Sequence, residues 1–170
     1  MRIREATSED FDEIARLTVD AYRALDTWVG DEYAGHLADV AARAGALNTT
    51  VLVAEDEPDR AGGSGGRILG SVTLTLGGGP YFEWNHGVDG DCGFRMLAVD
   101  PAAQGRGVGP RLVVECLDRA RAAGCRRMVI GSTEWMTTAH RIYERLGFRR
   151  APELDQQWGD IRGLCFTLDL

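Results

Sequence analysis

Residues 96–120 read MLAVDPAAQGRGVGPRLVVECLDRA and join a short apolar run, a glycine-rich segment and an amphipathic helix. Pro110 stands where the first residue of the helix is expected. Proline suits that position, because an N–H there would have no partner within the helix. A glycine-rich loop before a helix N-terminus directs backbone N–H groups at one point, which predicts an anion site, most naturally for phosphate. Apolar residues at spacings of one, three and four predict the buried face of the helix: Leu112, Val113, Cys116, Leu117 and Ala120.

Two common phosphate-binding loops do not fit this segment. A P-loop needs a lysine followed by serine or threonine, and the chain contains no lysine. The dinucleotide-binding pattern needs its third glycine one residue beyond Gly109 and an acidic residue about 20 positions later. Residues 125–128 are basic instead. What remains is Gln104-x-x-Gly107-x-Gly109, directly after the run Leu97-Ala98-Val99-Asp100-Pro101.

Together with residues 139–148 (AHRIYERLGF), this segment resembles two motifs of the GNAT family of N-acetyltransferases. The first motif is the coenzyme A loop, and the second is the helix A-x-x-L-Y-x-x-x-G-F. The resemblance implies a sheet whose fourth and fifth strands splay apart, with acetyl-CoA in the wedge between them. It carries the coenzyme contacts onto the following residues: Leu97, Ala98, Val99, Gln104, Gly105, Arg106, Gly107, Val108, Gly109, Arg111, Ala139 and Tyr143.

The element order predicted along the chain is that of a mixed α/β fold. The last strand closes a mostly antiparallel sheet flanked by helices. Strands are expected at 2–5, 50–55, 67–76, 94–99, 126–131 and 163–170, and helices at 11–25, 31–44, 110–123 and 136–146. The second and third strands would form a hairpin, and the irregular stretch 77–91 would face the substrate.

Length and composition predict one cytoplasmic domain over residues 1–170. The charged start MRIREATSED has no apolar signal core, and no apolar run approaches the roughly 18 residues that cross a bilayer. The four cysteines and three histidines are scattered, which favours buried thiols over disulfides and predicts no metal site: Cys92, Cys116, Cys125, Cys165, His36, His86 and His140.

The net charge of −7 disfavours nucleic acid as a partner. The resemblance implies a small-molecule or peptide amine as the partner, and no membrane is expected to be involved. Whether the chain is a monomer or a homodimer is left open. The same charge is also what ordinary solubility requires.

Acetyl transfer requires a polarised thioester carbonyl, a neutral amine and a protonated leaving thiolate. The resemblance assigns the first to a backbone N–H of the fourth strand, at Leu97 to Val99, and the third to the Tyr143 hydroxyl as general acid. A tyrosine of pKa about 10 can protonate a thiolate whose thiol has a pKa of about 8.5. On its own, Tyr143 would equally suit a core aromatic of an amphipathic helix.

The base that deprotonates the amine is not assigned. An alkylamine of pKa about 10.4 is neutral in roughly one molecule per 2,500 at pH 7, a cost of about 4.6 kcal/mol. Many family members carry a glutamate at the position of Gly93, and Asp91 shares that strand face by period-two alternation. Asp91 is therefore the first candidate, and Glu83, His86 and Glu134 are the others.

Other departures concern the coenzyme site. Pro110 removes one N–H from the loop, and Met136 replaces an asparagine that in many family members contacts pantetheine. Arg106 and Arg111 are placed for the coenzyme phosphates but suit a solvated surface equally well. The leading hypothesis is an acetyl-CoA-dependent N-acetyltransferase that works by direct transfer. A longer acyl donor and a catalytically silent acyl-CoA-binding module are the alternatives.

Overall fold

The structure is a computed structural model that describes residues 1–25, 29–56, 66–82 and 89–170. Eight strands form one sheet, and five α-helices connect or cover them in the described part of the chain. The strands are β1 (Arg2–Glu5), β2 (Thr49–Glu55), β3 (Ile68–Thr75), β4 (Asp91–Val99), β5 (Arg127–Thr133), β6 (Arg149–Arg150), β7 (Gln156–Trp158) and β8 (Ile161–Asp169). The helices are α1 (Phe11–Leu25), α2 (Asp31–Ala38), α3 (Val40–Ala44), α4 (Val108–Ala122) and α5 (Thr137–Arg145).

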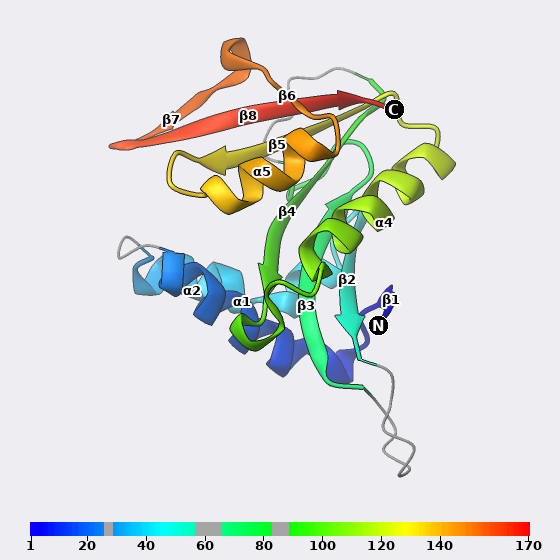
Figure 1. Cartoon of the computed structure of the whole chain (residues 1–170), viewed down its shortest axis with the longest axis vertical. Coiled ribbons are helices and arrows are strands. Elements are labelled where there is room, and N and C mark those ends of the chain that lie inside the picture. The colour runs from blue at the N-terminus through cyan, green and yellow to red at the C-terminus, as the bar shows by residue number, and fades with distance from the viewer. Residues whose placement is uncertain (26–28, 57–65, 83–88) are drawn as a thin grey trace.

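The sheet order is β1-β2-β3-β4-β5-β8-β6, and β7 also pairs with β8. All of these pairs are antiparallel except β4 with β5, which run parallel. That parallel pairing joins only Asp91 to Arg127 and Cys92 to Met128. Beyond it the two strands diverge, as Figure 1 shows. The predicted mixed, mostly antiparallel fold with splayed fourth and fifth strands is therefore confirmed.

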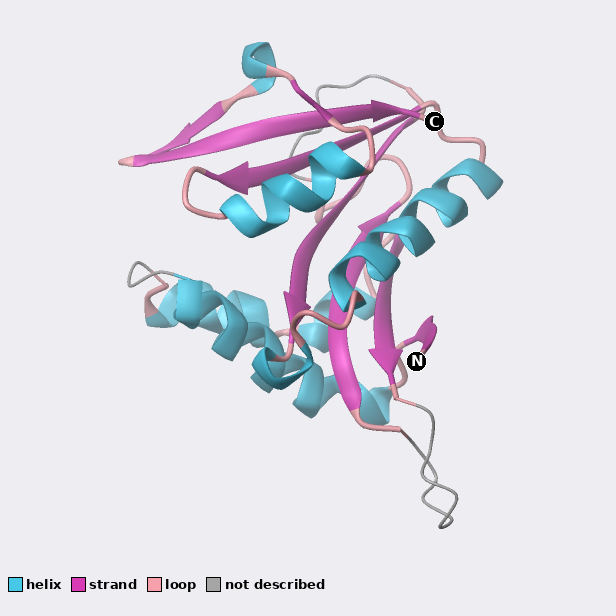
Figure 2. Ribbon diagram, viewed as in Figure 1, coloured by secondary structure: helices cyan, strands magenta, loops and turns pink. Residues whose placement is uncertain are grey.

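The helices form two groups on the two faces of the sheet, both visible in Figure 2. Strand β2 shows the alternation that separates the faces, because successive side chains of a strand point to opposite sides. Leu52 and Ala54 pack in the core under α4 and α5, whereas Val51 and Val53 pack against α1 and α3. Figure 1 shows α4 in front of β2 and β3, and α5 in front of β5. The parting strands are thus flanked by α4 and α5 on one face.

The structure differs from the sequence-based expectation in three elements. The helix expected over 31–44 breaks at Asp39, whose side chain caps α3 by accepting a hydrogen bond from the Ala42 N–H at 3.0 Å. Helix α4 begins at Val108, two residues before Pro110. The segment between α5 and the last strand adds two short strands, β6 and β7. All three differences lie at the ends of helices or strands, where caps and turns rather than apolar periodicity determine the boundary.

The four cysteines are free thiols, and only Cys125 is not fully buried. None of the helices in the described ranges is both long enough and apolar enough to cross a membrane.

Candidate functional site

A cavity of about 650 Å³ opens where β4 and β5 part. Its walls are the second half of β4, the loop into α4, the end of β5 and the inner side of α5, with residues of α1, α2 and β7 completing the lining. Most of the residues predicted to bind the coenzyme lie on these walls: Leu97, Ala98, Val99, Gln104, Gly105, Gly107, Val108, Gly109, Ala139 and Tyr143. The splayed strands therefore bring both sequence motifs to one space.

The loop at the start of α4 has the backbone shape of an anion cradle. Gly105 and Gly107 both have φ of +77°, a left-handed conformation that favours glycine. Gly107 is the N-cap of α4, and the first intrahelical bond runs from the Arg111 N–H to its carbonyl at 3.2 Å. The N–H groups of Val108 and Gly109 precede that bond and have no intrahelical acceptor. Pro110 belongs to the same unbonded first turn, so its missing N–H disrupts no helical bond.

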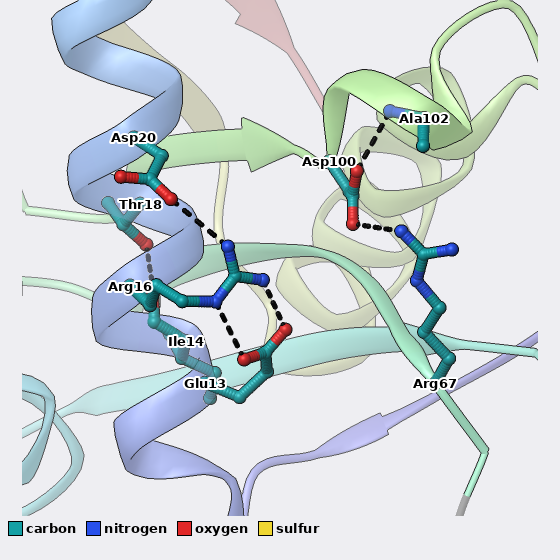
Figure 3. A network of polar contacts seen from close by, with 8 residues as sticks. All are labelled: Glu13, Ile14, Arg16, Thr18, Asp20, Arg67, Asp100 and Ala102. Atoms are coloured by element: carbon teal, nitrogen blue, oxygen red, sulfur yellow. Dashed lines mark hydrogen bonds and ion pairs between the residues drawn. The ribbon is translucent and has the colours of Figure 1, made fainter.

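Asp100 fixes the end of β4 from which this loop departs. Its carboxylate accepts a hydrogen bond from the Ala102 N–H at 2.8 Å and pairs with Arg67 at 2.6 Å, as Figure 3 shows. Its backbone N–H also donates to the Leu69 carbonyl at 2.9 Å. The Arg67 guanidinium holds the pKa of the Asp100 carboxyl below its usual value. The start of the loop is therefore held in place by the hydrogen bonds and the ion pair of Asp100.

A β-bulge in β4 takes Leu97 out of the regular ladder. Ser71 pairs with Ala98 and Thr73 with Arg95, so Met96 and Leu97 together stand opposite the single residue between Ser71 and Thr73. Met96 has φ of +52°, a conformation that costs a non-glycine residue about 1–3 kcal/mol. Bulges re-aim backbone groups and are frequent beside active sites. The bulge thus lies where the resemblance places the N–H that polarises the thioester.

Tyr143 lies on the cavity wall within an aromatic cluster formed by α5, the turn after it and the sheet. Its ring centroid is 5.8 Å from that of Phe94, 5.8 Å from Phe148 and 5.6 Å from Phe166. The side chain is 5% exposed, and burial raises the pKa of the phenol well above its usual range. Tyr143 therefore keeps its proton at neutral pH, as a general acid must before it acts.

The sequence did not predict a hydroxyl–imidazole pair of which one member, Ser132, lies on the same wall. Ser132, near the end of β5, lines the cavity and lies within 3.0 Å of His140, measured from Oγ to Nε2. His140 is on α5, one turn before Tyr143. A serine and a histidine eight residues apart carry no recognised motif, so only the fold reveals that they meet.

Arg106 and Arg111 do not line the cavity in the part of the chain that the structure describes. Arg106 pairs with Asp56 at 2.7 Å, which ties the loop to the end of β2. Arg111 is exposed on α4. Met136, the N-cap of α5, does line the cavity at the place where an asparagine was expected from the resemblance.

The family model described as the Acetyltransferase (GNAT) family matches residues 11–148. The chain belongs to this family. The match spans both motifs and the strands that part between them, which confirms the predicted family and, with it, the class of enzyme.

Curated relatives with related names match shorter segments. A mycothiol acetyltransferase of Streptosporangium roseum is 42% identical over 55 residues, which are 32% of this chain and 16% of that protein. A glucosamine 6-phosphate N-acetyltransferase of Trypanosoma brucei brucei is 32% identical over 84 residues, 49% of this chain and 52% of that protein. The chain thus spans at most about half the length of these relatives.

Solved structures share the GNAT fold over nearly the whole chain. A ribosomal-protein-alanine N-acetyltransferase from Brucella melitensis superposes with a TM-score of 0.69 at 21% identity, covering 100% of both chains. The structure of yncA from Salmonella typhimurium, determined with its cofactor acetyl-CoA, has a TM-score of 0.66 at 24% identity and covers 100% of this chain and 94% of that one. At these identities the likeness establishes the fold.

Of the candidate bases, the two that the structure describes, Asp91 and Glu134, do not line the cavity. Asp91 lies at the closed end of the wedge, 3% exposed, where Arg127 holds both carboxylate oxygens at 3.0 and 2.6 Å. This placement differs from the expectation that Asp91 faces the reacting groups, because Asp91 does not line the cavity and its charge is already paired with Arg127. Glu134 is exposed and lies 4.0 Å from Arg162. Glu83 and His86 lie outside the described residues.

Gly93, which replaces the glutamate of many GNAT proteins, has a packing explanation. A Cβ at this position would lie 2.5 Å from the Val129 carbonyl oxygen and 2.8 Å from Cε2 of the Phe82 ring. Phe82 is 8% exposed and occupies the space that a longer side chain would need. Position 93 therefore cannot carry a glutamate here without rearrangement of this core.

Proposed function

We propose that this chain transfers an acetyl group from acetyl-CoA to a primary amine by direct transfer. The observation that carries the proposal is one cavity whose walls include the glycine cradle, the Leu97 bulge and Tyr143. A negatively charged pyrophosphate suits a cradle of N–H groups at a helix N-terminus. A thioester suits a wall that offers both a backbone donor and a protonated phenol.

Residues 104–109 and Ala139 would hold acetyl-CoA, which supplies the activated acetyl group. The cradle fits this role because Gly105 and Gly107 leave open space where a Cβ would stand. A side chain at Gly109 would instead press on Ile142 at 3.2 Å, so glycine there also lets α5 approach α4. Arg106 can turn to the coenzyme phosphates only by giving up its ion pair with Asp56.

The acceptor would enter from the side of α1, α2 and β7. Tyr22, Tyr33 and Trp158 line the cavity there, so aromatic rings surround the incoming amine. The relatives named for glucosamine 6-phosphate and for a ribosomal-protein alanine make an amino sugar and a peptide α-amine the first acceptors to try.

The test is release of free thiol from acetyl-CoA with a panel of amines: glucosamine 6-phosphate, a peptide with N-terminal alanine, and Nα-acetyl-lysine. We expect turnover with at least one of them and mass-spectrometric detection of the acetylated product. Binding of acetyl-CoA without turnover across a broader panel would contradict the proposal. That outcome would favour the silent coenzyme-binding module, which the replacement of glutamate by Gly93 supports.

A further inference from the structure

An amine in the cavity would meet no carboxylate that could deprotonate it among the described residues of the wall. Among the residues that the structure describes, no aspartate or glutamate lines its walls. Asp91 is held by Arg127 and Glu134 is on the surface. An alkylamine nevertheless has to lose a proton before it can attack, at a cost of about 4.6 kcal/mol at pH 7.

Ser132, on the cavity wall, and His140, in contact with it, form a hydroxyl–imidazole pair that can accept a proton. Ser132 lines the cavity and is 5% exposed, and its hydroxyl oxygen is 3.0 Å from Nε2 of His140. The rings of His140 and Tyr143 both pack against Phe166, with centroid distances of 5.0 and 5.6 Å. Ser132 and the predicted general acid Tyr143 therefore both line the cavity, and His140 packs beside them.

We propose that Ser132 and His140 form the route by which the acceptor amine loses its proton. The Ser132 oxygen takes a proton from the ammonium while its own proton passes to Nε2 of His140. Ser132 is the catalytic residue that touches the substrate, and His140 acts through it. This inference rests on the acetyl transfer proposed above and names the base which that reaction needs.

The surroundings of His140 suit a proton acceptor. The ring is half-buried, and burial lowers the pKa of the imidazole, helped by the charge of Arg150 on β6. A backbone hydrogen bond with Thr133 on β5 and the charge of Glu144 on α5 act in the opposite direction. If the other ring nitrogen donates its N–H to the Thr133 carbonyl, Nε2 is left free to accept from Ser132.

The protons balance along this route. As the C–N bond forms and the C–S bond breaks, two protons leave the ammonium nitrogen in converting it to an amide. Ser132 and His140 pass one of them to water, which the half-buried imidazole reaches. The second replaces the proton that Tyr143 gives to the sulfur. The net release is one proton for each acetyl group transferred.

The test is the pH profile of kcat/KM for His140→Gln, which keeps a hydrogen-bonding side chain but cannot take up the proton. The acceptor in this test is the amine that the wild-type protein acetylates fastest among those named under the proposed function. For an alkylamine, the wild-type profile should be flat from near neutral pH to the amine pKa of about 10.4. The variant should be about 100-fold slower at pH 7, with a defect that shrinks about tenfold per pH unit.

Two further variants separate a relay from a structural role. Ser132→Ala should reproduce the pH-dependent defect, and the double variant should be no slower than either single one, because the groups act in series. His36→Gln, a histidine outside the cavity wall, should leave the profile unchanged. Acetyl-CoA affinity, measured by calorimetry, should stay within about twofold in all of them.

The relay is overturned by a His140→Gln defect that is equal at every pH, by no defect, or by additive effects in the double variant. A Ser132→Ala protein that loses acetyl-CoA affinity but keeps its pH profile would make Ser132 a coenzyme contact instead. In each of these cases wild-type turnover leaves the proposed acetyl transfer intact. Absence of wild-type turnover with every amine would remove both.

Discussion

Strands β4 and β5 meet at one end and part at the other, and the two ends use their residues in opposite ways. At the closed end Asp91 and Arg127 satisfy each other's charge, and the Gly93 backbone packs against Phe82 and Val129. At the open end the Leu97 bulge, Tyr143 and Ser132 face a cavity. Polar groups at the closed end are committed to one another, whereas those at the open end can meet a ligand. Within a few residues of the same two strands, the closed end thus contributes to stability and the open end supplies groups that can bind a ligand.

This contrast predicts losses of activity at the open end and losses of stability at the closed end. The largest effect is expected for Tyr143→Phe. Removal of the hydroxyl should lower kcat by about 100- to 10,000-fold, because general acid catalysis typically contributes that much. Steady-state kinetics with calorimetry checks this, and acetyl-CoA affinity should be nearly unchanged. A wild-type kcat would return Tyr143 to a purely packing role.

The next effect concerns the glycine cradle. Gly107→Val should weaken acetyl-CoA binding by about 10- to 100-fold, since valine at φ of +77° is strained by about 1–3 kcal/mol and fills the cradle. Gly124 is the matched control, with φ of +76° just beyond the other end of α4 and open space at its Cβ position. Gly124→Val should lose comparable stability yet bind acetyl-CoA normally. Equal affinities in the two variants would remove the loop from the coenzyme site.

At the closed end, Gly93→Ala should lower the free energy of unfolding by about 2–3 kcal/mol. The added methyl meets a carbonyl oxygen and a ring in a packed interior. Urea denaturation measures this. Gly35→Ala, on α2 with open space at its Cβ position, should be neutral or stabilising. A fully stable Gly93→Ala protein would mean that the missing glutamate has no packing cause.

The smallest effect is expected for Asp91→Asn. The substitution leaves a nearly isosteric amide beside Arg127. Because Arg127 is partly exposed, water can offset the lost charge, so we expect the free energy of unfolding to fall by about 1–2 kcal/mol. The rate of acetyl transfer should be unchanged at every pH. Asp118→Asn, at the exposed pair with Arg121, should change stability by less than about 0.5 kcal/mol. A selective loss of rate at low pH in Asp91→Asn would restore Asp91 as the base.

The open end was largely predictable from the sequence, because its signals are local. The Gly-x-Gly spacing before a helix requires left-handed backbone in the loop, and Gly105 and Gly107 adopt it. The apolar spacing within residues 139–148 predicts which face of α5 points inward, and Tyr143 lies on that face. The loop conformation and the inward face of α5 both depend on residues that are close together in the sequence.

What sequence could not supply was the partner of each side chain across the fold. Period-two alternation grouped Asp91 with Gly93, but the pairing with Arg127 depends on a register between strands 36 residues apart. Arg106 looked available for phosphate until the fold placed Asp56 beside it. The meeting of Ser132 with His140 likewise depends on how α5 packs on β5.

A crystal structure of the chain with acetyl-CoA tests the central claim most directly. The pyrophosphate should lie against the N–H groups of residues 105–109, and the thioester between the Leu97 backbone and the Tyr143 hydroxyl. Ser132 should face the space left for the amine. A coenzyme bound outside the parting of β4 and β5, or a thioester beside Asp91, would contradict the account.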